Sequence, residues 1–327
     1  MRQSDACNVV AVVVTFQPDL EVLGLLIDAL LAQVESIIIV DNGSHEDLDA
    51  WHNQRQTPAV KSLLMGENKG IAAAHNIGIQ WAQNKGADFA LLMDQDSIPA
   101  PDMVEKLLSA FLEVKNKCGA QPIAAGPICM DTRSNKKSFF VTEQYGFPWR
   151  WRDDTPLENE NFSIEVSALI SSGTLIDLKA FQAVGGMRSN YFIDHVDTEW
   201  CFRARAKSYV LLGVPKALMK HTLGDKIANI WFFGWRHVAY HSPLRDYYMF
   251  RNTLLMFHNV KMSFFMRLYL LWRLLKFIIY FLFFAPQRLQ RFYCMTLGIS
   301  HGVRGISGKL DLKTGQCTQI QKSDLDP

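Results

Sequence analysis

Residues 87–97 read ADFALLMDQDS, an apolar run that ends in two carboxylates. A continuous run of this kind predicts a strand buried on both faces, as in a parallel sheet. Asp94 and Asp96 stand two residues apart at its end, and side chains at i and i+2 of an extended backbone point the same way. Both carboxylates can therefore face one divalent cation, and hard oxygen ligands suit Mg²⁺ or Mn²⁺. Taken alone the motif is weak, because Asp is common in turns after strands.

Strand-like and helix-like stretches alternate along the first half of the chain. Apolar runs at 11–16, 36–40 and 60–65 predict strands, and apolar residues at helical spacing predict helices at 19–34, 71–86 and 101–117. This order predicts an α/β fold with a Rossmann-like, mostly parallel sheet flanked by helices. Ligands of such sheets bind beyond the carboxyl ends of the strands. The polar residues at those ends are Thr15, Asp41, Asn42, Asp94 and Asp96.

The composition excludes several classes of protein. Of the 327 residues, 49% are hydrophobic and 20% charged, which rules out a disordered or low-complexity chain. The net charge of +2 gives no indication of a nucleic-acid partner. The six cysteines are scattered without a CxxC pair, and the N-terminus lacks the length and cleavage site of a signal peptide. We therefore expect a cytoplasmic protein in a reducing compartment.

The C-terminal part has a different electrostatic character. Residues 247–310 contain no Asp or Glu but nine Lys or Arg. The most apolar stretch, 262–285, is interrupted by Arg267, Arg273 and Lys276, whereas a spanning helix needs about 20 mostly apolar residues. We expect a helix that lies in the membrane interface with its basic side chains facing anionic headgroups. The alternative is a buried helical hairpin at a domain or subunit interface, and a homo-oligomer stays possible.

A second acidic cluster lies at 191–206, YFIDHVDTEWCFRARA. We expect a helix from Thr198 onward, with Asp197 at its N-cap. Asp197 is then either a catalytic base or a plain cap beside a surface Glu199–Arg203 pair. His221 follows a short predicted strand at 209–214, and a lone histidine is more often structural than a ligand. Residues 133–161 are expected to form a long loop or flap over the site.

Two further segments suit a nucleotide ligand, each with a plainer alternative. Asn68-Lys69-Gly70 precedes a predicted helix, whose N-terminus attracts phosphate, but taken alone this segment is better explained as a plain helix cap. Asp41 can accept a hydrogen bond from a base or ribose, or it can cap its own DNGS turn. Neither GxGxxG nor GxxxxGK[ST] occurs, which argues against a nicotinamide-binding fold and a P-loop.

Eight short stretches occur in an order that resembles family 2 glycosyltransferases of the GT-A fold. The resemblance is closest to bacterial rhamnosyltransferases that build O-antigen and related cell-surface polysaccharides. The stretches are VVVTFQP, IIIVDNGS, NKGIAAAHNIGI, LLMDQDS, SSGTLI, FQAVGGMRSNYFIDHVDTEWCFRA, KHTLGD and RDYYMFRN, and they cover roughly Val9 to Asn252. Val196-Asp197 stands where the family usually has a Glu-Asp pair, and the second acid is Glu199. The rhamnosyltransferase-like group resembles this sequence in that departure.

The resemblance implies an inverting, metal-dependent transferase with a catalytic domain at 1–225 and a helical, membrane-associated region at 226–327. Asp197 would be the general base, and Asp94, Asp96 and His221 would hold Mg²⁺ or Mn²⁺. Ser172 with Gly173 would border a sugar, and Arg251 with Asn252 would touch a diphosphate or merely pack. The implied nucleotide-sugar-binding residues are Thr15, Asp41, Asn68, Lys69, Asp94, Gln95, Gly173 and Arg251.

The implied donor is dTDP-L-rhamnose, and the implied acceptor is a lipid-linked saccharide at the inner face of the cell membrane. Nothing in the sequence determines the base or the sugar, so a galactofuranosyl- or hexosyltransferase that uses a UDP-sugar is an alternative. A catalytically idle membrane scaffold would predict decay of the acidic sites, yet these are present. A nucleotidyltransferase normally opens with a Gly-rich loop that bears Arg or Lys, and VVVTFQP has none.

Overall fold

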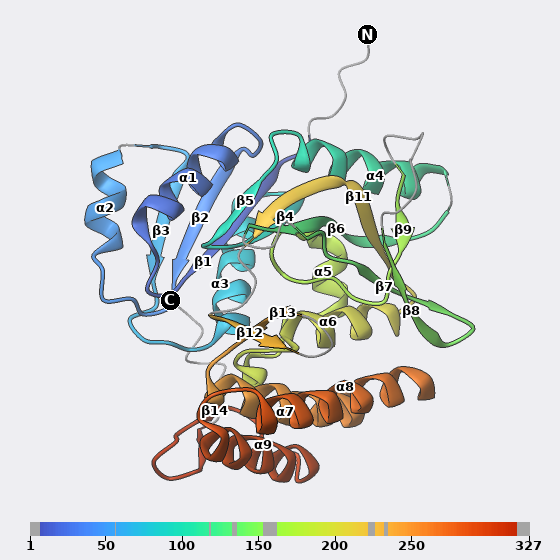
Figure 1. Ribbon diagram of the computed structural model, residues 1–327. Coiled ribbons are helices and arrows are strands. Elements are labelled where there is room, and N and C mark those ends of the chain that lie inside the picture. The colour runs from blue at the N-terminus through green and yellow to red at the C-terminus, as the bar shows by residue number, and fades with distance from the viewer. Residues whose placement is uncertain are drawn as a thin grey trace.

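A computed structural model of the protein describes residues 7–55, 57–117, 119–132, 136–152, 162–221, 226–231 and 235–318. Its centre is a nine-stranded sheet in the order β3-β2-β1-β4-β10-β6-β11-β5, with β9 paired to β11 (Figure 1). The strands of this sheet are β1 (Val9–Thr15), β2 (Ser36–Asp41), β3 (Val60–Leu64), β4 (Phe89–Asp94), β5 (Ser97–Pro99), β6 (Pro122–Asp131), β9 (Ile164–Glu165), β10 (Leu175–Asp177) and β11 (Val210–His221).

Most strands of the sheet run in one direction. β1 pairs in parallel with β2 and β4, and β2 with β3. β10 is antiparallel to both β4 and β6, so β6 and its parallel partner β11 point the same way as β4. The expected α/β fold with a mostly parallel sheet is confirmed, and the carboxyl ends of β1, β2, β4, β6 and β11 lie along the same edge.

The apolar runs form strands because both of their faces are covered. Along β1, Val10, Val12 and Val14 join one hydrophobic cluster, while Val9, Ala11 and Val13 join the other. The second cluster is closed by α1 (Leu20–Leu31) and α4 (Met103–Lys117); the first is closed by α3 (Ile71–Asn84), α5 (Leu178–Val184) and α6 (Val196–Arg205). α2 (Leu48–Arg55) borders β3 at the sheet edge.

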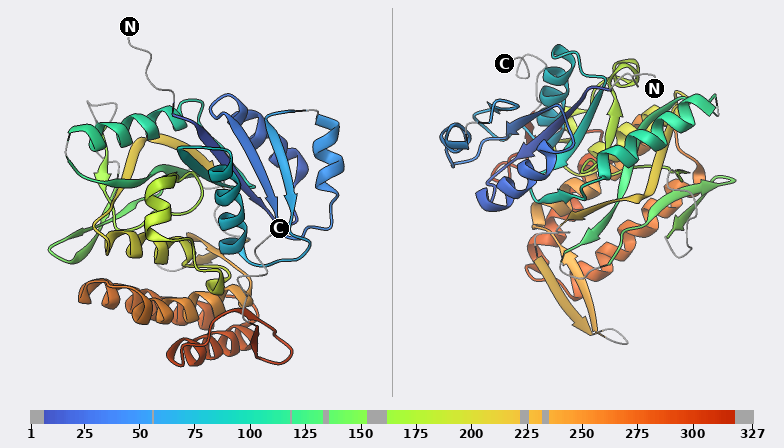
Figure 2. Two further views of the ribbon diagram at one scale, coloured as in Figure 1. Left: turned by 180° about the vertical axis from the view of Figure 1, so that it is seen from behind. Right: turned by 90° about the horizontal axis from the view of Figure 1, so that it is seen from above.

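The C-terminal helices pack against the α/β part. They are α7 (Pro243–Asn259), α8 (Phe264–Phe283) and α9 (Arg288–Val303). Leu255 and Met256 of α7 and Met266 and Leu270 of α8 belong to the same cluster as Trp200 of α6. Figures 1 and 2 show the three helices together, orange to red, on the side of the sheet that carries α6. Among the described helices, none has the length and apolarity to cross a bilayer.

Small two-stranded elements complete the fold. β12 (Lys226–Trp231) pairs with β13 (Trp235–Tyr240), and β14 (Lys309–Leu310) pairs with β15 (Cys317–Thr318). Residues 189–191 form a single 3-10 turn before α6. The predicted division of the chain at residues 225 and 226 stays a prediction.

Part of the expected long loop at 133–161 is a β-hairpin instead. β7 (Phe140–Gln144) pairs with β8 (Phe147–Trp151) across the two-residue turn Tyr145-Gly146. Both turn residues have positive φ, 52° and 82°, which matches the type I′ turn that suits the twist of a hairpin. The flanking stretches 133–135 and 153–161 lie outside the described residues.

Candidate active site

Asp94, Asp96 and His221 converge at the carboxyl edge of the sheet. Ligand atoms of the three side chains lie within 4.8 Å of one another, and His221 Nδ1 is 3.4 Å from Asp96 Oδ1. β11, predicted to end near 214, continues to His221, and its antiparallel pairing with β5 sets His221 opposite Ser97. Two carboxylates and an imidazole are hard or borderline donors, so the residues present fit Mg²⁺ or Mn²⁺.

A chain of hydroxyl groups connects the two sides of this cluster. Ser172 Oγ accepts a hydrogen bond from the backbone N–H of Asp94 at 3.1 Å and lies 2.8 Å from Ser97 Oγ. Ser97 Oγ in turn lies 2.7 Å from His221 Nδ1. Both serines are buried, so neither hydroxyl has water as a substitute partner. The chain therefore holds the imidazole in one orientation beside the carboxylates.

The electrostatics of the cluster favour a bound cation. Burial raises the pKa of Asp94 to about 6; the His221 charge lowers that pKa, and the charges of Asp96 and Asp197 raise it further. Like charges gathered in a partly buried site are costly unless a cation offsets them. A divalent ion would therefore stabilise the ionised form of Asp94.

Asp197 lies beside the loop that follows β9, and its charge acts on Asp94. α6 begins at Val196, and its N-cap is His195, so the predicted capping role of Asp197 is wrong. The Asp197 carboxylate instead accepts hydrogen bonds from the backbone N–H groups of Ser171 (3.1 Å) and Thr198 (2.6 Å). Burial raises the pKa of Asp197, and these hydrogen bonds oppose the rise. The carboxyl is thus oriented toward the segment that contains Ser172.

The backbone before Asp197 is held in an unusual conformation. Phe192, Asp194 and His195 have φ of 66°, 62° and 60°, a region that non-glycine residues enter at a cost. The Asn252 amide donates to the carbonyls of Tyr191, Ile193 and Asp194 at 2.9, 2.8 and 2.8 Å. α7 therefore fixes the turn from which Asp197 projects.

Arg251 also has a packing role, and its implied contact with a diphosphate is not supported. The side chain is fully buried, and its guanidinium donates to the carbonyls of Tyr191 (3.0 Å) and Gly308 (2.6 Å) and to Asn252 Oδ1 (2.9 Å). With its donors used by protein acceptors, Arg251 joins α7 to the turn before α6. Asn252 shares that role.

Glu199 is not available as an alternative base. Its side chain is fully buried, whereas the plainer of the two alternatives placed it at the surface. The carboxylate pairs with Arg188 at 2.8 Å and with Arg203 at 3.0 Å. The predicted i,i+4 pair with Arg203 exists, but in the interior of the protein. Asp197, by contrast, has no ion-pair partner among the described residues, and its charge acts on Asp94.

Thr15 and Asp41 meet at the ends of neighbouring strands. Thr15 Oγ1 donates to Asp41 Oδ1 at 2.9 Å, and Asp41 Oδ2 accepts from the N–H groups of Gly43 and Ser44. The Asp41 carboxylate thus caps its own turn, which is one of the two readings of the sequence. Both side chains are buried, and their contact with a nucleotide stays a prediction.

Gln95 and Gly173 shape the backbone around the cluster. The Gln95 amide bonds both the N–H and the carbonyl of Phe16, at 2.7 and 3.1 Å, and so joins the ends of β4 and β1. Gly173 has φ +80°, and a Cβ there would lie 2.6 Å from Pro127. Only glycine fits this close approach. A direct sugar contact of either residue stays a prediction.

The N-terminus of α3 does not offer the open phosphate site that was considered. The N–H of Ile71 already donates to the carbonyl of Phe192 at 2.8 Å. Asn68 Oδ1 accepts from the N–H of Gly70 at 3.0 Å, so it serves as a local cap. The backbone carbonyl of Asn68 accepts from Lys309 at 2.8 Å, and Asn42 Oδ1 accepts from the N–H of Lys69. The plainer reading of Asn68 and Lys69 is therefore favoured.

Sequence reasoning missed two arginines near the carboxylates. Arg245 of α7 forms a two-pronged pair with Asp194, at 2.7 and 3.2 Å. Arg273 of α8, expected to face lipid headgroups, is turned inward: burial lowers its pKa, whereas the charges of Tyr269, Asp194 and Asp197 raise it. The one signal for Arg245 is its place in the first turn of a helix, where the helix dipole disfavours a cation. Arg273 differs from Arg267 and Lys276 only in its angular position around the helix, so the sequence did not single it out.

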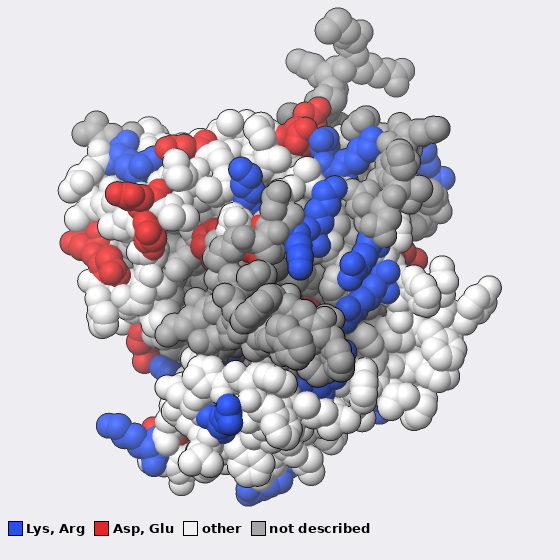
Figure 3. Space-filling view, in the orientation of Figure 1, with Lys and Arg blue, Asp and Glu red and all other residues white. Residues whose placement is uncertain are grey.

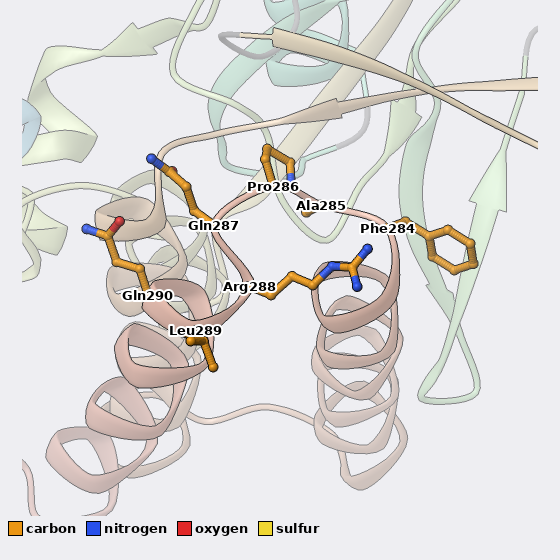
Figure 4. A pocket seen from close by; sticks show the side chains of 7 residues that line it. All are labelled: Phe284, Ala285, Pro286, Gln287, Arg288, Leu289 and Gln290. Atoms are coloured by element: carbon orange, nitrogen blue, oxygen red, sulfur yellow. The ribbon is translucent and has the colours of Figure 1, made fainter.

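The carboxylate cluster is distinct from an open depression between α8 and α9. Seven consecutive residues, 284–290, line that depression, and Figure 4 shows Arg288 reaching across it toward the end of α8. It contains no acidic side chain and none of the predicted site residues. The chemistry therefore belongs to the sheet edge.

Comparisons with known proteins identify the family of the chain. Residues 11–185 match the family described as Glycosyl transferase family 2. The chain is 33% identical over 257 residues to the dTDP-rhamnosyl transferase RfbF of Shigella flexneri, covering 76% of this chain and 79% of that protein.

Solved structures show the same fold. TarS residues 1–349 of S. aureus in complex with UDP-GlcNAc gives a TM-score of 0.58 at 14% identity, over 90% of this chain and 81% of that chain. GalNAc-T7 with UDP, GalNAc and Mn²⁺ gives 0.54 at 15% identity, over 67% of this chain and 44% of that one.

Proposed function

The chain belongs to glycosyltransferase family 2, and we propose that it is an inverting, metal-dependent L-rhamnosyltransferase that uses dTDP-L-rhamnose. The strongest support for this donor is the 33% identity to a dTDP-rhamnosyl transferase over most of both chains. Asp94, Asp96 and His221 supply the ligand set for a cation that binds a diphosphate, and Asp197 supplies a carboxylate beside it.

Asp197 is the proposed general base. A carboxylate can take the proton of an acceptor hydroxyl as that oxygen attacks the anomeric carbon. The N–H of Ser171 orients the carboxyl group of Asp197. Burial raises the pKa of Asp197, which brings it closer to the pKa of a hydroxyl group than the pKa of an exposed aspartate is. Asp94 and Asp96 are the proposed metal ligands, and the other described carboxylates near the site are ion-paired: Asp194 with Arg245, and Glu199 with Arg188 and Arg203. This leaves none of these carboxylates to act as a nucleophile.

Asp94, Asp96 and His221 would hold Mg²⁺ or Mn²⁺. The bound ion would neutralise charge on the leaving nucleoside diphosphate. The Ser97–Ser172 hydroxyl chain keeps His221 facing the two carboxylates. With one base and one stabilised leaving group, a single displacement suffices. A β-L-rhamnosyl donor then yields an α-L-rhamnoside.

The proposed acceptor is a lipid-linked saccharide, because α8 has the features of a helix that lies in a membrane interface. At about 100° per residue its exposed apolar side chains fall within an arc of about 120°. These side chains are Phe264, Leu268, Leu271, Trp272, Leu275, Ile279 and Phe283. Arg267 and Lys276 flank the arc on its two sides, as expected for contact with anionic headgroups.

The β7–β8 hairpin extends this apolar face. Phe147 stacks on Phe265 at the start of α8, with ring centroids 3.7 Å apart, and Tyr145 and Trp149 are exposed nearby on the hairpin. Ser263 Oγ bonds the Gly146 carbonyl at 2.8 Å and fixes the hairpin to the helix. In Figure 3 the hairpin and the C-terminal helices form a largely uncharged surface, in contrast to the acidic side chains around α1 and α2. A cluster of exposed apolar side chains of this kind marks a binding face.

We propose that this face places the enzyme at the inner side of the cell membrane, where lipid-linked acceptors for cell-surface polysaccharides such as O-antigen are found. The alternative donor class is a UDP-sugar. Thermal shift with dTDP and with UDP, each with Mg²⁺, separates the two. We expect the larger shift with dTDP; because one methyl group in an apolar pocket is worth about 1–3 kcal/mol, the difference is modest. Equal or reversed shifts would favour a galactofuranosyl- or hexosyltransferase.

A further inference from the structure

The charge balance around Asp94 and Asp197 leaves a role for a cation of the protein. Asp94, Asp96, Asp194 and Asp197 gather there, and one divalent ion offsets only two of these charges. A nucleoside diphosphate brings further negative charge to the same place. Two arginines lie near these carboxylates: Arg245 pairs with Asp194 at 2.7 Å, and the charges of Asp194 and Asp197 act on Arg273.

Arg245 is the better placed of the two. Its side chain is 30% exposed, and its partner Asp194 stands three residues before Asp197, whose carboxylate is joined to the end of β4 by the Ser171–Ser172 loop. Arg273 lies on α8, and the charges of Asp194 and Asp197, the proposed base, raise its pKa. A planar guanidinium that already forms a two-pronged pair with a carboxylate has the geometry to bind phosphate oxygens in the same way.

The two arginines of α7 differ in a manner that indicates their roles. Arg251 is fully buried and donates to main-chain carbonyls, which is a structural arrangement. Arg245 is partly exposed in the first turn of α7, where the helix dipole disfavours a cation and favours an anion. Its carboxylate partner Asp194 stands in the left-handed turn and is 18% exposed, and Nη1 of Arg245 lies 2.9 Å from His241 Nδ1. An anion that replaced Asp194 on this guanidinium would also benefit from the helix N-terminus.

We propose that Arg245 binds the diphosphate of the sugar nucleotide opposite the metal site, and that Asp194 holds the arginine in place until the donor arrives. This inference rests on the proposed function. It assigns to α7, beyond the stretch that matches the family, a direct contact with the donor. It also gives RDYYMFRN two functions: Arg245 for the ligand, and Arg251 with Asn252 for the turn before α6.

Calorimetric binding of dTDP, dTMP and UDP to the full chain with Mg²⁺ tests the proposal. We expect Arg245→Gln to weaken dTDP binding about 10- to 100-fold, as for loss of charge-assisted hydrogen bonds, and to weaken dTMP binding much less. Asp194→Asn breaks the same ion pair but leaves the arginine, so dTDP should bind as tightly as to wild type or more tightly. Arg304→Gln, an exposed arginine on the far end of α9, controls for loss of one positive charge.

The outcomes separate the possible explanations. If Arg245 only fastens α7 to the turn, Arg245→Gln and Asp194→Asn will weaken dTDP equally, and the proposal is wrong. Unchanged dTDP affinity in Arg245→Gln also overturns it. Should Arg245→Gln not fold, Arg245→Lys keeps the charge without the fork and must still weaken dTDP by several-fold. A wild type that binds none of the three nucleotides would instead contradict the proposed function itself.

Discussion

The Asp197 carboxylate accepts a hydrogen bond from the backbone N–H of Ser171 at 3.1 Å, and the next residue, Ser172, accepts from the N–H of Asp94. One short loop therefore contacts both the proposed base and the strand end that holds the metal ligands. The distance from base to leaving group depends on this loop and on the turn that Asn252 fixes.

Replacing Asp197 by Asn keeps the shape of the side chain and removes the proton acceptor. General base catalysis contributes about 10²–10⁴-fold, so turnover should fall by that amount while donor affinity changes little. Steady-state kinetics and calorimetry measure the two effects separately.

Glu199→Gln is the matched control for that variant. Glu199 pairs with Arg188 and Arg203 in the interior, and breaking a buried pair costs about 3–5 kcal/mol. The melting temperature should therefore fall, whereas turnover per folded molecule should stay near wild type. A folded Glu199→Gln that is inactive, beside an active Asp197→Asn, would transfer the base role to Glu199.

Turnover should decline on the acid side at a pH above the usual aspartate range. Burial raises the pKa of Asp197, and only the deprotonated carboxylate can accept a proton. Activity is thus present above the raised pKa and is lost as the pH falls through it. The measurement is kcat against pH at saturating metal and donor; an acid limb at or below pH ~3.9, the ordinary aspartate value, would argue against a buried base.

Ser97→Ala should weaken metal binding. Ser97 Oγ contacts His221 Nδ1 at 2.7 Å, and loss of such an outer partner of a metal ligand typically costs about 10–100-fold in affinity. Mn²⁺ titration followed by electron paramagnetic resonance measures this without an activity assay. Excess Mn²⁺ should restore turnover, and EDTA should abolish it in the wild type.

Ser138→Ala provides the comparison for Ser97. Ser138 Oγ also accepts a hydrogen bond inside the sheet region, from the N–H of Cys129 at 3.0 Å, but it does not contact His221. Mn²⁺ affinity should be unchanged in this variant. Equal affinities of wild type and Ser97→Ala would mean that the hydroxyl chain does not position His221.

The double variant Trp272→Glu with Leu275→Glu should bind vesicles less than wild type. Both side chains lie in the exposed arc of α8, with 54% and 45% exposure, and a charge there opposes insertion into the interface. Co-sedimentation with phosphatidylglycerol vesicles measures binding. Raising the salt from about 0.1 to about 1 M shortens the Debye length from about 10 to about 3 Å and should also reduce binding.

Leu25→Glu on α1 is the control for the membrane variant. Leu25 is 59% exposed but lies on the opposite face of the sheet, so vesicle binding should not change. Equal binding by wild type and the double variant would indicate that the face of α8 is a protein interface instead.

The sheet could be predicted because its signals are local. Runs such as AVVVTF and SIIIVD are apolar throughout, since helices cover both faces of β1 and β2. The β7–β8 hairpin escaped prediction because FPWRW mixes Pro and Arg with aromatics, and its turn is Tyr-Gly rather than Asn-Gly. The start of α6 was misplaced because His195 adopts φ 60°, which no local pattern announces.

The proposed metal ligands and the residues around them differ in how far the sequence predicts their positions. Asp94 and Asp96 follow an apolar run and are visible locally, whereas His221 joins them only through the pairing of β5 with β11. Ser97 and Arg245 owe their positions to partners 124 and 51 residues away, so their contacts require the folded chain. In the sequence Arg273 looks like the other basic residues of its stretch, so it was assigned to the lipid face. Its inward orientation depends on how α8 packs in the folded chain, which the sequence does not reveal.

Inverting transfer from dTDP-β-L-rhamnose determines which anomer of the sugar forms first. With water as the acceptor and Mg²⁺ present, time-resolved proton NMR identifies the sugar before mutarotation. We expect α-L-rhamnose first, at a rate lowered by Asp197→Asn. Initial release of β-L-rhamnose, or a rate unaffected by Asp197→Asn, would contradict this mechanism.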